Sequence, residues 1–270
     1  PHMIRSSIMT DAVATRFIVR TVDGTPPQVR EHNDSLVTER LLEVLVNGQP
    51  YGQTMRCPGM DDLLVRGLLV ADGLVWQAGQ ITGVHVGQRD GIDYADVLLD
   101  PELDVTRNRA GTTDVASVLA RRQQPPANDL RVGVEVIREL PRALMAGQFA
   151  FGRTGASHAV GLFTSAAEPL VICEDVGRHN AMDKVLGWAL INDRIPAHDR
   201  LLFVSGRQSF DLITKAAMAG IPLLAGVSAP TSLAVSAADE LGITLCGFVR
   251  GERMNIYSHA ERIIVDAPVG

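Results

Sequence analysis

The sequence predicts an α/β protein, with a layered α/β domain at residues 130–270 and a smaller α+β domain at residues 4–104. From about residue 148 onward, short apolar runs alternate with amphipathic helical patterns, as in a sheet covered by helices. The runs at 201–205 and 222–228 are apolar almost throughout, which is typical of strands buried on both faces of a parallel sheet. The chain has 270 residues, 46% hydrophobic and 21% charged, so its core can fold without disulfides or metal.

The N-terminal domain is expected to begin at residue 4, because residues 1–3 are interpreted as a native methionine preceded by the remnant of a cloning tag. Asn47-Gly48 is a residue pair that tight hairpin turns favour. Apolar residues at helical spacing indicate one helix, which Gly73 ends. The expected elements are an edge strand at 16–21, a loop at 23–34, a strand at 39–48, a helix at 59–72, and strands at 82–88 and 93–99 around an Asp90-Gly91 turn.

Residues 105–129 are expected to form a mobile connection between the two domains, because they are polar and contain a Gln-Gln-Pro-Pro run. In the C-terminal domain, Gly220 and Gly242 follow two helical patterns, where glycine commonly ends a helix. Pro141 is expected to interrupt an earlier helix. The expected elements are a helix at 130–146, strands at 157–163 and 169–173, a helix at 176–191, a strand at 201–205, a helix at 209–219, a strand at 222–228, a helix at 231–241 and a strand at 244–250.

Polar and basic residues follow three of these strands. In open α/β sheets, ligands bind beyond the carboxyl ends of the strands, where helix N-termini offer free N–H groups to an anion. Arginines there can add bidentate contacts to phosphate. We therefore expect a site for a phosphorylated ligand such as a nucleotide, although each residue alone could be a helix N-cap or a solvated charge. The residues are Ser205, Gly206 and Arg207, then Ser228 and Thr231, then Arg250, Gly251, Glu252 and Arg253.

Asp175, His179 and Lys184 fall on a helical pattern whose opposite side is apolar. They predict a face that holds a ligand or relays a proton; the alternative is a solvated helix face with i,i+4 charge pairs. His158 stands at a strand start beside a small-residue turn, where it either joins this site or has no role in it. No second histidine or cysteine pair lies at ligand spacing, so no metal site is expected.

The three cysteines, Cys57, Cys173 and Cys246, are too few and too far apart for a disulfide framework or a cysteine-only zinc site, and they indicate a reducing cytoplasm. Cys57 precedes a helix, where a thiolate is favoured; the alternative, which we favour, is a small buried apolar residue. The net charge of −6 argues against a nonspecific nucleic-acid binder. No run of about 18 apolar residues occurs, so no membrane span is expected.

Several motifs, spread over residues 39–258, together resemble one family. They are RCPGMDDLLVRGLLVADGLV (56–75), TGASHAVGLF (154–163), EDVGRHNAMDKVLGWAL (174–190), SGRQSFDLITKAAMAGIP (205–222), VSAPTSLAV (227–235) and GFVRGERMNIYS (247–258). In this combination and order, they resemble the formate dehydrogenase accessory proteins of the FdhD type, a family of sulfurtransferases and molybdenum cofactor chaperones.

The resemblance implies a cytidine-deaminase-like, three-layer α/β/α C-terminal domain without a zinc site. It implies a cytoplasmic homodimer that receives sulfur from a cysteine desulfurase and serves formate dehydrogenase. The cargo would be the molybdenum cofactor bis(molybdopterin guanine dinucleotide), whose anionic nucleotide parts agree with the arginines at the strand ends. The family's cofactor-binding stretch corresponds to Phe248, Val249, Arg250, Gly251, Glu252 and Arg253.

One departure from the family pattern changes the expected activity. The family transfers sulfur through a Cys-x-x-Cys loop between its domains, and the corresponding stretch here, residues 107–116, contains no cysteine. Without a thiolate, that loop has no nucleophile to carry a persulfide. We therefore predict a chaperone that binds and delivers the cofactor. Two alternatives stay open: a sulfur carrier that uses Cys57 and, more remotely, a nucleotide hydrolase or deaminase.

Overall fold

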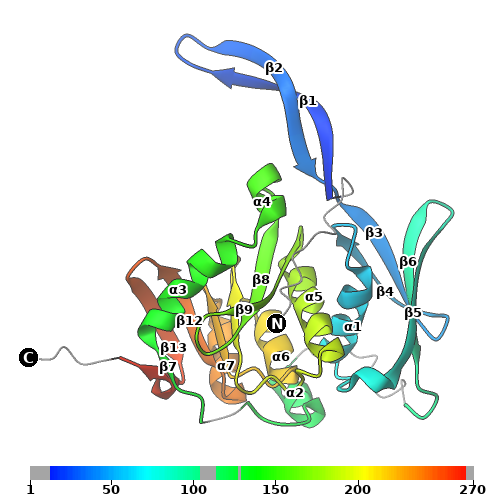
Figure 1. The fold of residues 1–270 in the computed structure, drawn as a ribbon, viewed down its shortest axis with the longest axis vertical. Coiled ribbons are helices and arrows are strands. Elements are labelled where there is room, and N and C mark those ends of the chain that lie inside the picture. Colours follow the sequence, from blue (N-terminus) through cyan, green and yellow to red (C-terminus); the bar gives the residue numbers. More distant parts are fainter. Residues whose placement is uncertain (1–12, 104–113, 127–128, 266–270) are drawn as a thin grey trace, which may run out of the picture.

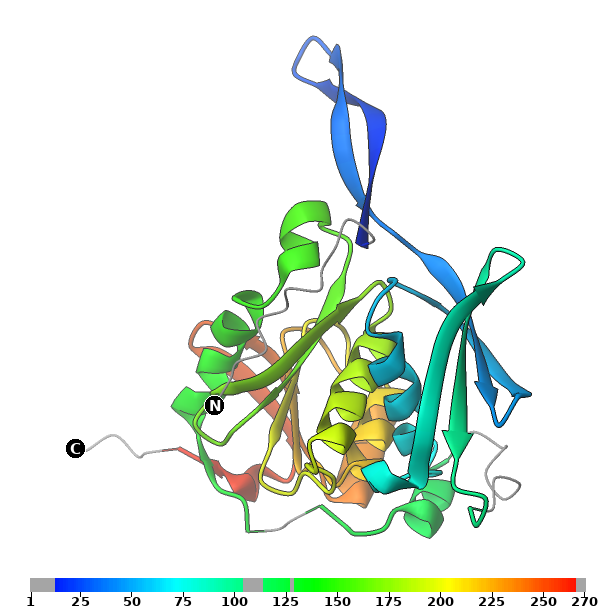
Figure 2. The same ribbon diagram turned by 45° about the vertical axis from the view of Figure 1, so that its right-hand side comes forward.

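The computed structural model describes residues 13–103, 114–126 and 129–265. A four-stranded sheet comes from the N-terminal part of the chain and a six-stranded sheet from the C-terminal part, with helices packed between and around them (Figure 1). A separate hairpin, β1–β2, projects away from this body in both views (Figures 1 and 2). The predicted mixed α/β fold is confirmed.

The N-terminal sheet has the strand order β4-β3-β6-β5, in which β3 and β6 run parallel and the other neighbours run antiparallel. Its strands are β3 (Arg40–Val46), β4 (Gln49–Arg56), β5 (Ile81–Arg89) and β6 (Ile92–Leu99). Asn47 and Gly48 have φ values of 51° and 72°, the left-handed conformation that a tight hairpin turn requires at both positions. The strands predicted from alternation are confirmed, but the pattern does not predict β4, whose residues are mostly exposed.

The projecting hairpin consists of β1 (Ala14–Asp23) and β2 (Gln28–Val37). The edge strand predicted at 16–21 lies within β1 and is confirmed. The loop predicted at 23–34 is wrong for most of its length, because β2 begins at Gln28. Polar residues occupy both faces of β2, so this strand has no hydrophobic alternation by which it could be predicted.

The C-terminal sheet has the order β13-β12-β11-β10-β8-β9, and only β10, β11 and β12 run parallel. Its strands are β8 (His158–Phe163), β9 (Pro169–Asp175), β10 (Leu201–Val204), β11 (Leu223–Gly226), β12 (Thr244–Arg250) and β13 (Arg253–Ser258). The prediction of a parallel sheet therefore holds for its centre. Because strands are buried on both faces in either arrangement here, apolar runs alone cannot reveal direction.

Helices cover both faces of this sheet. Core residues of α5 (Arg178–Ile191), α6 (Phe210–Met218) and α7 (Ser232–Leu241) pack on one face, and those of α3 (Val134–Met145) pack on the other. The predicted break at Pro141 is wrong, because α3 continues through it and buries Ile137, Leu140 and Leu144 along one stripe. That burial offsets the cost of a proline inside a helix.

The remaining elements are short. They are α2 (Val115–Arg121), α4 (Phe149–Thr154), β7 (Val132–Gly133), β14 (Ile263–Ile264) and two 3-10 turns at Ala78–Gln80 and Ala260–Arg262. Helix α2 lies within the stretch predicted as a mobile connection, and Asp114 caps it by accepting a hydrogen bond from the Ser117 N–H at 2.7 Å. Residues 104–113 and 127–128 lie outside the described residues.

Helix α1 (Asp61–Ala71) joins the two sheets by lying directly against α5 (Figure 2). A Cβ atom at Gly67 would stand 1.7 Å from the backbone oxygen of Asp183, and one at Gly187 would stand 1.9 Å from that of Leu63. Only glycine permits this approach at both positions. One apolar cluster then runs from the N-terminal sheet through α1 and α5 to the C-terminal sheet, so the two predicted domains share a core.

Candidate functional site

The carboxyl ends of β10, β11 and β12 meet at one edge of the C-terminal sheet, as predicted. The turn after β10 is tied to the turn after β11 by the Gln208 N–H, which donates to Ala229, and by the Thr231 N–H, which donates to Gln208. The Phe248 N–H donates to the Ser228 oxygen at 3.0 Å, which ties β12 to the same edge. The structure therefore brings together three groups of predicted site residues: 205–207, Ser228 with Thr231, and 248–253.

Gln208 organises this edge, although nothing in the sequence marks it. Its side chain is fully buried and donates from Nε2 to the Cys246 oxygen at 3.3 Å. A Cβ atom at Gly226 would lie 2.2 Å from Nε2, so the strand must carry glycine there. A glutamine between polar loop residues gives no signal of burial, because its contacts come from two other strands.

Some of the predicted site residues have structural roles: they cap a helix, join two strands or fill the core. The Thr231 Oγ1 accepts from the Ala234 N–H and caps α7, so the N-cap alternative is confirmed there. The Ser205 hydroxyl oxygen accepts from the Ala159 N–H at 2.9 Å and joins β10 to β8. The side chain of Val249 is fully buried in the core. Only the backbone of Val249 is in a position to meet a ligand.

The turn between β12 and β13 presents exposed side chains. Phe248 is 37% exposed and has φ 53°, a conformation that is costly for an aromatic residue and typical of functional sites. The next exposed residues are Arg250, Gly251 and Glu252. Arg250 donates from Nε to the Val227 oxygen at 3.0 Å, which leaves the outer guanidinium nitrogens directed elsewhere. The turn therefore exposes the aromatic ring of Phe248 close to the guanidinium group of Arg250, which its hydrogen bond holds in place.

Four basic side chains gather next to Gly206. His158 comes from the start of β8, Arg178 and His179 from the start of α5, and Arg207 from the turn after β10. A Cβ atom at Gly206 would lie 3.2 Å from Nδ1 of His158 and 3.4 Å from Cδ of Arg178. The helical pattern in the sequence marks His179 and gives no signal for its neighbour Arg178.

The two histidines of this cluster favour their neutral forms. Burial, Arg178 and Arg207 all lower the pKa of His158. Burial lowers the pKa of His179 as well, with further lowering by Arg178 and Lys215 and an opposing effect of Asp211. His179 Nε2 lies 3.3 Å from the Ser209 hydroxyl and 3.5 Å from Oδ2 of Asp211.

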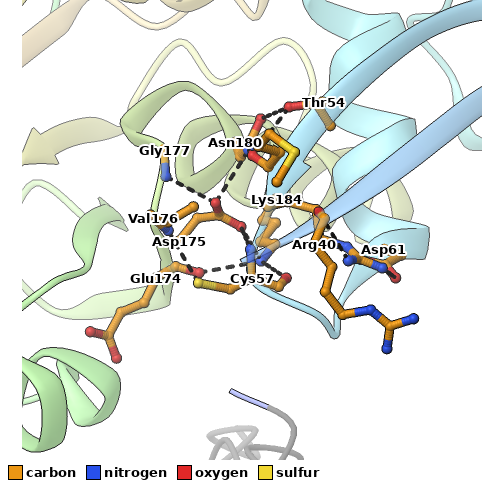
Figure 3. Close-up of polar contacts among 12 residues, drawn as sticks. Arg40, Thr54, Cys57, Asp61, Glu174, Asp175, Val176, Gly177, Asn180 and Lys184 are labelled. Carbon is orange, nitrogen blue, oxygen red and sulfur yellow. Dashed lines mark hydrogen bonds and ion pairs between the residues drawn. The ribbon is translucent and has the colours of Figure 1, made fainter. Parts of the chain in front are cut away.

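Asp175 and Lys184, by contrast, form a buried pair at the junction of the two sheets (Figure 3). Asp175 ends β9 rather than lying on the helix, and it is fully buried. Its Oδ2 accepts from Lys184 Nζ at 2.6 Å and from the Cys57 N–H at 3.2 Å. Its Oδ1 accepts from the Gly177 N–H at 3.0 Å and from Asn180 Nδ2 at 3.2 Å. The carboxylate is therefore satisfied by four protein groups.

The ammonium group of Lys184 is satisfied in the same way. Besides Asp175, it donates to the backbone oxygens of Cys57 and Glu174, each at 3.3 Å. Lys184 is 2% exposed, and Asp183 on the same helix is buried and paired with Lys215 of α6. The solvated-face alternative is thus wrong for these residues. In this conformation neither Asp175 nor Lys184 has a hydrogen-bonding group left for a ligand.

The Cys57 segment is held from both sides. Arg56 is buried and donates to both carboxylate oxygens of Asp61, each at 2.8 Å, and also to Asp93 at 2.8 Å. Cys57 is 2% exposed, and its sulfur accepts a hydrogen bond from the Val176 N–H at 3.2 Å. Burial, reinforced by Asp175, raises the pKa of Cys57 to about 11. The thiolate expected ahead of a helix is therefore disfavoured, and the alternative of a small buried residue is confirmed.

The other two cysteines lie deep in the C-terminal sheet. Cys173 and Cys246 are buried, and burial raises the pKa of each to about 12. Residues 107–113, the start of the stretch that corresponds to the family's Cys-x-x-Cys loop, fall outside the described residues. Across the described ranges, no three His, Cys, Asp or Glu side chains come together as a metal site. Of the helices that the structure describes, none is long and apolar enough to cross a membrane.

Two known proteins are similar to this chain over most of their length. The chain is 42% identical over 260 residues to the sulfur carrier protein FdhD of Nocardia farcinica, covering 90% of this chain and 93% of that protein. It is 38% identical over 239 residues to the protein of the same name from Sulfurisphaera tokodaii, covering 86% and 92%.

A solved structure agrees with the fold. The crystal structure of a candidate formate dehydrogenase accessory protein from Desulfotalea psychrophila superimposes with a TM-score of 0.76 at 24% identity, covering 93% of this chain and all of that one. A model of the FdhD/NarQ family matches residues 37–264, which include both sheets and every predicted site residue. The chain belongs to the FdhD/NarQ family.

Proposed function

We propose that this protein binds bis(molybdopterin guanine dinucleotide) at the carboxyl edge of the C-terminal sheet and delivers it to a formate dehydrogenase. The observation that carries the proposal is the convergence of Arg207, Arg250 and Arg253 on this edge. Within the described residues, no ion pair is recorded for any of the three guanidinium groups. Arginines that lack acidic partners are well suited to the phosphates of such a cargo.

The exposed residues at this edge fit the parts of that cargo. Phe248 offers an aromatic face on which a guanine base can stack. Arg250 and Arg253 flank the β12–β13 turn, within reach of phosphate oxygens beside that base. The beginning of α6, where Ser209 makes no side-chain cap bond, adds a helix dipole that favours an anion.

We favour a chaperone over a sulfur carrier because none of the three cysteines is suited to carry a persulfide. The transfer needs an accessible thiolate, and each thiol is buried with a raised pKa. Cys57 remains the alternative carrier, since it lies where the two sheets meet and its loop could expose it by opening. The hydrolase or deaminase alternative is not favoured. The Ser209 hydroxyl and Asp211 both lie beside the same nitrogen of His179, Nε2, whereas a catalytic triad uses both ring nitrogens. Among the described residues, no metal site of the kind a deaminase uses is formed.

Five further expectations accompany this function. We propose that the C-terminal half has the cytidine-deaminase-like arrangement, that the protein works in the cytoplasm, and that it acts as a homodimer. Its acceptor is the catalytic subunit of formate dehydrogenase, and a cysteine desulfurase is a donor only if Cys57 carries sulfur. These expectations come from the family and from the reduced cysteines.

Binding of GDP, a fragment of the cargo, tests the proposal. We expect micromolar or tighter affinity by calorimetry. Replacing Arg250 or Arg253 by alanine should cost about 1.5–3 kcal/mol, or about 10- to 150-fold in Kd, because each removes charge-assisted hydrogen bonds. Arg194→Ala, in the loop beyond the far end of α5, is the control and should bind like wild type. A well-folded wild-type protein that does not bind GDP would refute the proposal.

A further inference from the structure

Beside the β12–β13 turn, the same sheet edge carries a second group of basic side chains. We propose that Arg178, Arg207, His158 and His179 form a second binding site, for the phosphate oxygens of a phosphorylated ligand. The inference shares Arg207 with the proposed function and rests on it for the natural ligand's identity, whereas the contacts described below are independent of Phe248 and Arg250.

The first support is the unbalanced charge. Glu174, the nearest acid on β9, is already engaged: it accepts from the Ala150 and Phe151 N–H groups and from the Ser157 hydroxyl. Asp175 is paired with Lys184. Asp211 faces the cluster, with Oδ2 3.5 Å from His179 Nε2, but its side chain is 61% exposed, so solvent screens it strongly. With both histidines favouring their neutral forms, Arg178 and Arg207 supply the positive charge of the cluster, in a chain whose net charge is −6.

The second support is an unsatisfied donor. The Nε–H of Arg178 is buried and has no hydrogen-bond partner among the described residues. A buried donor without an acceptor costs about 1–3 kcal/mol, and an oxygen of a bound ligand would remove that cost. A guanidinium group has only donors, in a planar fork that matches the oxygens of phosphate. We therefore expect an oxyanion to bind at Arg178.

The third support is the backbone beneath the cluster. Gly206 leaves room for the ring of His158 and the stem of Arg178 to pack over the chain at 3.2–3.4 Å from where a Cβ would stand. Helices α5 and α6 both begin here, and neither Gly177 nor Ser209 caps its helix with a side chain. Two positive helix ends thus point to the same place as four basic side chains.

The site is distinct from the β12–β13 turn. Arg207 follows β10, whereas Phe248 and Arg250 belong to β12, and β11 lies between them. Neighbouring strands are about 4.8 Å apart, so β10 and β12 are separated by roughly 10 Å. A ligand with phosphates on one side and a base on the other can occupy both.

The titration of the histidines gives an independent signature. Burial lowers the pKa of both histidines, and repulsion adds to it: from Arg178 and Arg207 at His158, and from Arg178, Lys215 and His158 at His179, where Asp211 opposes it. A bound oxyanion offsets this repulsion and raises both pKa values. Binding near neutral pH is therefore expected to take up protons, and affinity is expected to rise as the pH falls.

Calorimetry of the full chain with inorganic diphosphate tests the site. Wild-type protein should bind diphosphate, Arg178→Met should bind about tenfold more weakly or worse, and Arg178→Lys should fall between them. Arg194→Met, in the loop beyond the opposite end of α5, is the matched control and should bind like wild type. Because Arg178 has no recorded ion pair within the described ranges, Arg178→Met should unfold at the wild-type temperature. Titrations in buffers of different ionisation enthalpy should show proton uptake.

Two outcomes would overturn the inference: wild-type protein that does not bind diphosphate, or Arg178→Met that binds it as wild type does. GDP separates this inference from the proposed function. If Arg250→Ala weakens the binding of GDP while Arg178→Met leaves the affinity for GDP unchanged, the proposed function stands and this site is refuted. If diphosphate binding depends on Arg178 but GDP binds no more tightly than diphosphate, this site stands and guanine recognition fails.

Discussion

Asp175 and Lys184 show that a residue pattern does not reveal which contacts a side chain makes in the fold. The sequence predicts a functional polar face, because Asp175, His179 and Lys184 fall on a helical pattern whose opposite side is apolar. The structure places Lys184 at 2% exposure with three protein acceptors. One of those acceptors is the backbone of Cys57, more than a hundred residues away in sequence, so no local pattern could predict the contact.

Removing one partner of this pair should destabilise the fold. In Lys184→Met the carboxylate of Asp175 stays buried without its cation, at a cost of about 3–5 kcal/mol in unfolding free energy. Denaturant unfolding measures this cost. The matched control is Arg20→Met, which breaks a pair with Glu31 whose side chains are 76% and 57% exposed, and should change stability by less than about 1 kcal/mol. Equal stability of Lys184→Met and wild type would show that the pair is not needed.

The thiol of Cys57 should be unreactive in the native protein. Its pKa is raised to about 11, so almost none is thiolate near neutral pH, and the residue is 2% exposed. Iodoacetamide should therefore modify none of the three cysteines of native protein within the time that modifies all three in guanidinium. Mass spectrometry counts the adducts. Rapid native modification at Cys57 alone would instead mark it as an accessible carrier.

Among the strands and helices, the sequence predicts those with a clear hydrophobic pattern and misses those without one. Strands β8, β10, β11 and β12 are buried throughout most of their length, so their apolar runs suffice to predict them. Strands β2 and β4 and helix α4 are largely exposed or short, and local propensity alone does not reveal them. The same limit applies to the site: strand ends are predictable, whereas Gln208 and Arg178 act through contacts between elements.

The contact between α1 and α5 is the element-scale feature most sensitive to mutation. Gly67→Ala and Gly187→Ala each place a methyl group within 1.9 Å of a backbone oxygen on the facing helix. Each should destabilise the protein by about 1–3 kcal/mol or more, since the helices must separate. Gly152→Ala on α4 is the control, because nothing lies within 4 Å of its Cβ position and alanine favours a helix there. Thermal unfolding tests the contrast, and equal melting temperatures for the two classes would contradict the close crossing.

At the scale of the whole molecule, the two sheets behave as one unit. A single apolar cluster includes residues from both, and the α1–α5 crossing and the Asp175–Lys184 pair lie along the same junction. The sequence divides the chain by composition and cannot reveal this shared core, because the contacts are made by residues far apart in sequence. The basic sheet edge is also a property of the whole molecule: the chain is acidic overall, yet folding brings arginines and histidines from several elements together at one edge.

We propose that this protein works by holding the cofactor at the sheet edge and not by carrying sulfur on a cysteine. Formate dehydrogenase activity, measured in cells that lack their own accessory protein and express variants of this one at equal level, tests it most directly. We predict that Cys57→Ala supports wild-type activity and that the double variant Arg250→Ala/Arg253→Ala supports almost none. Loss of activity in Cys57→Ala, with activity retained in the double arginine variant, would refute cofactor binding at this edge as the basis of the activity.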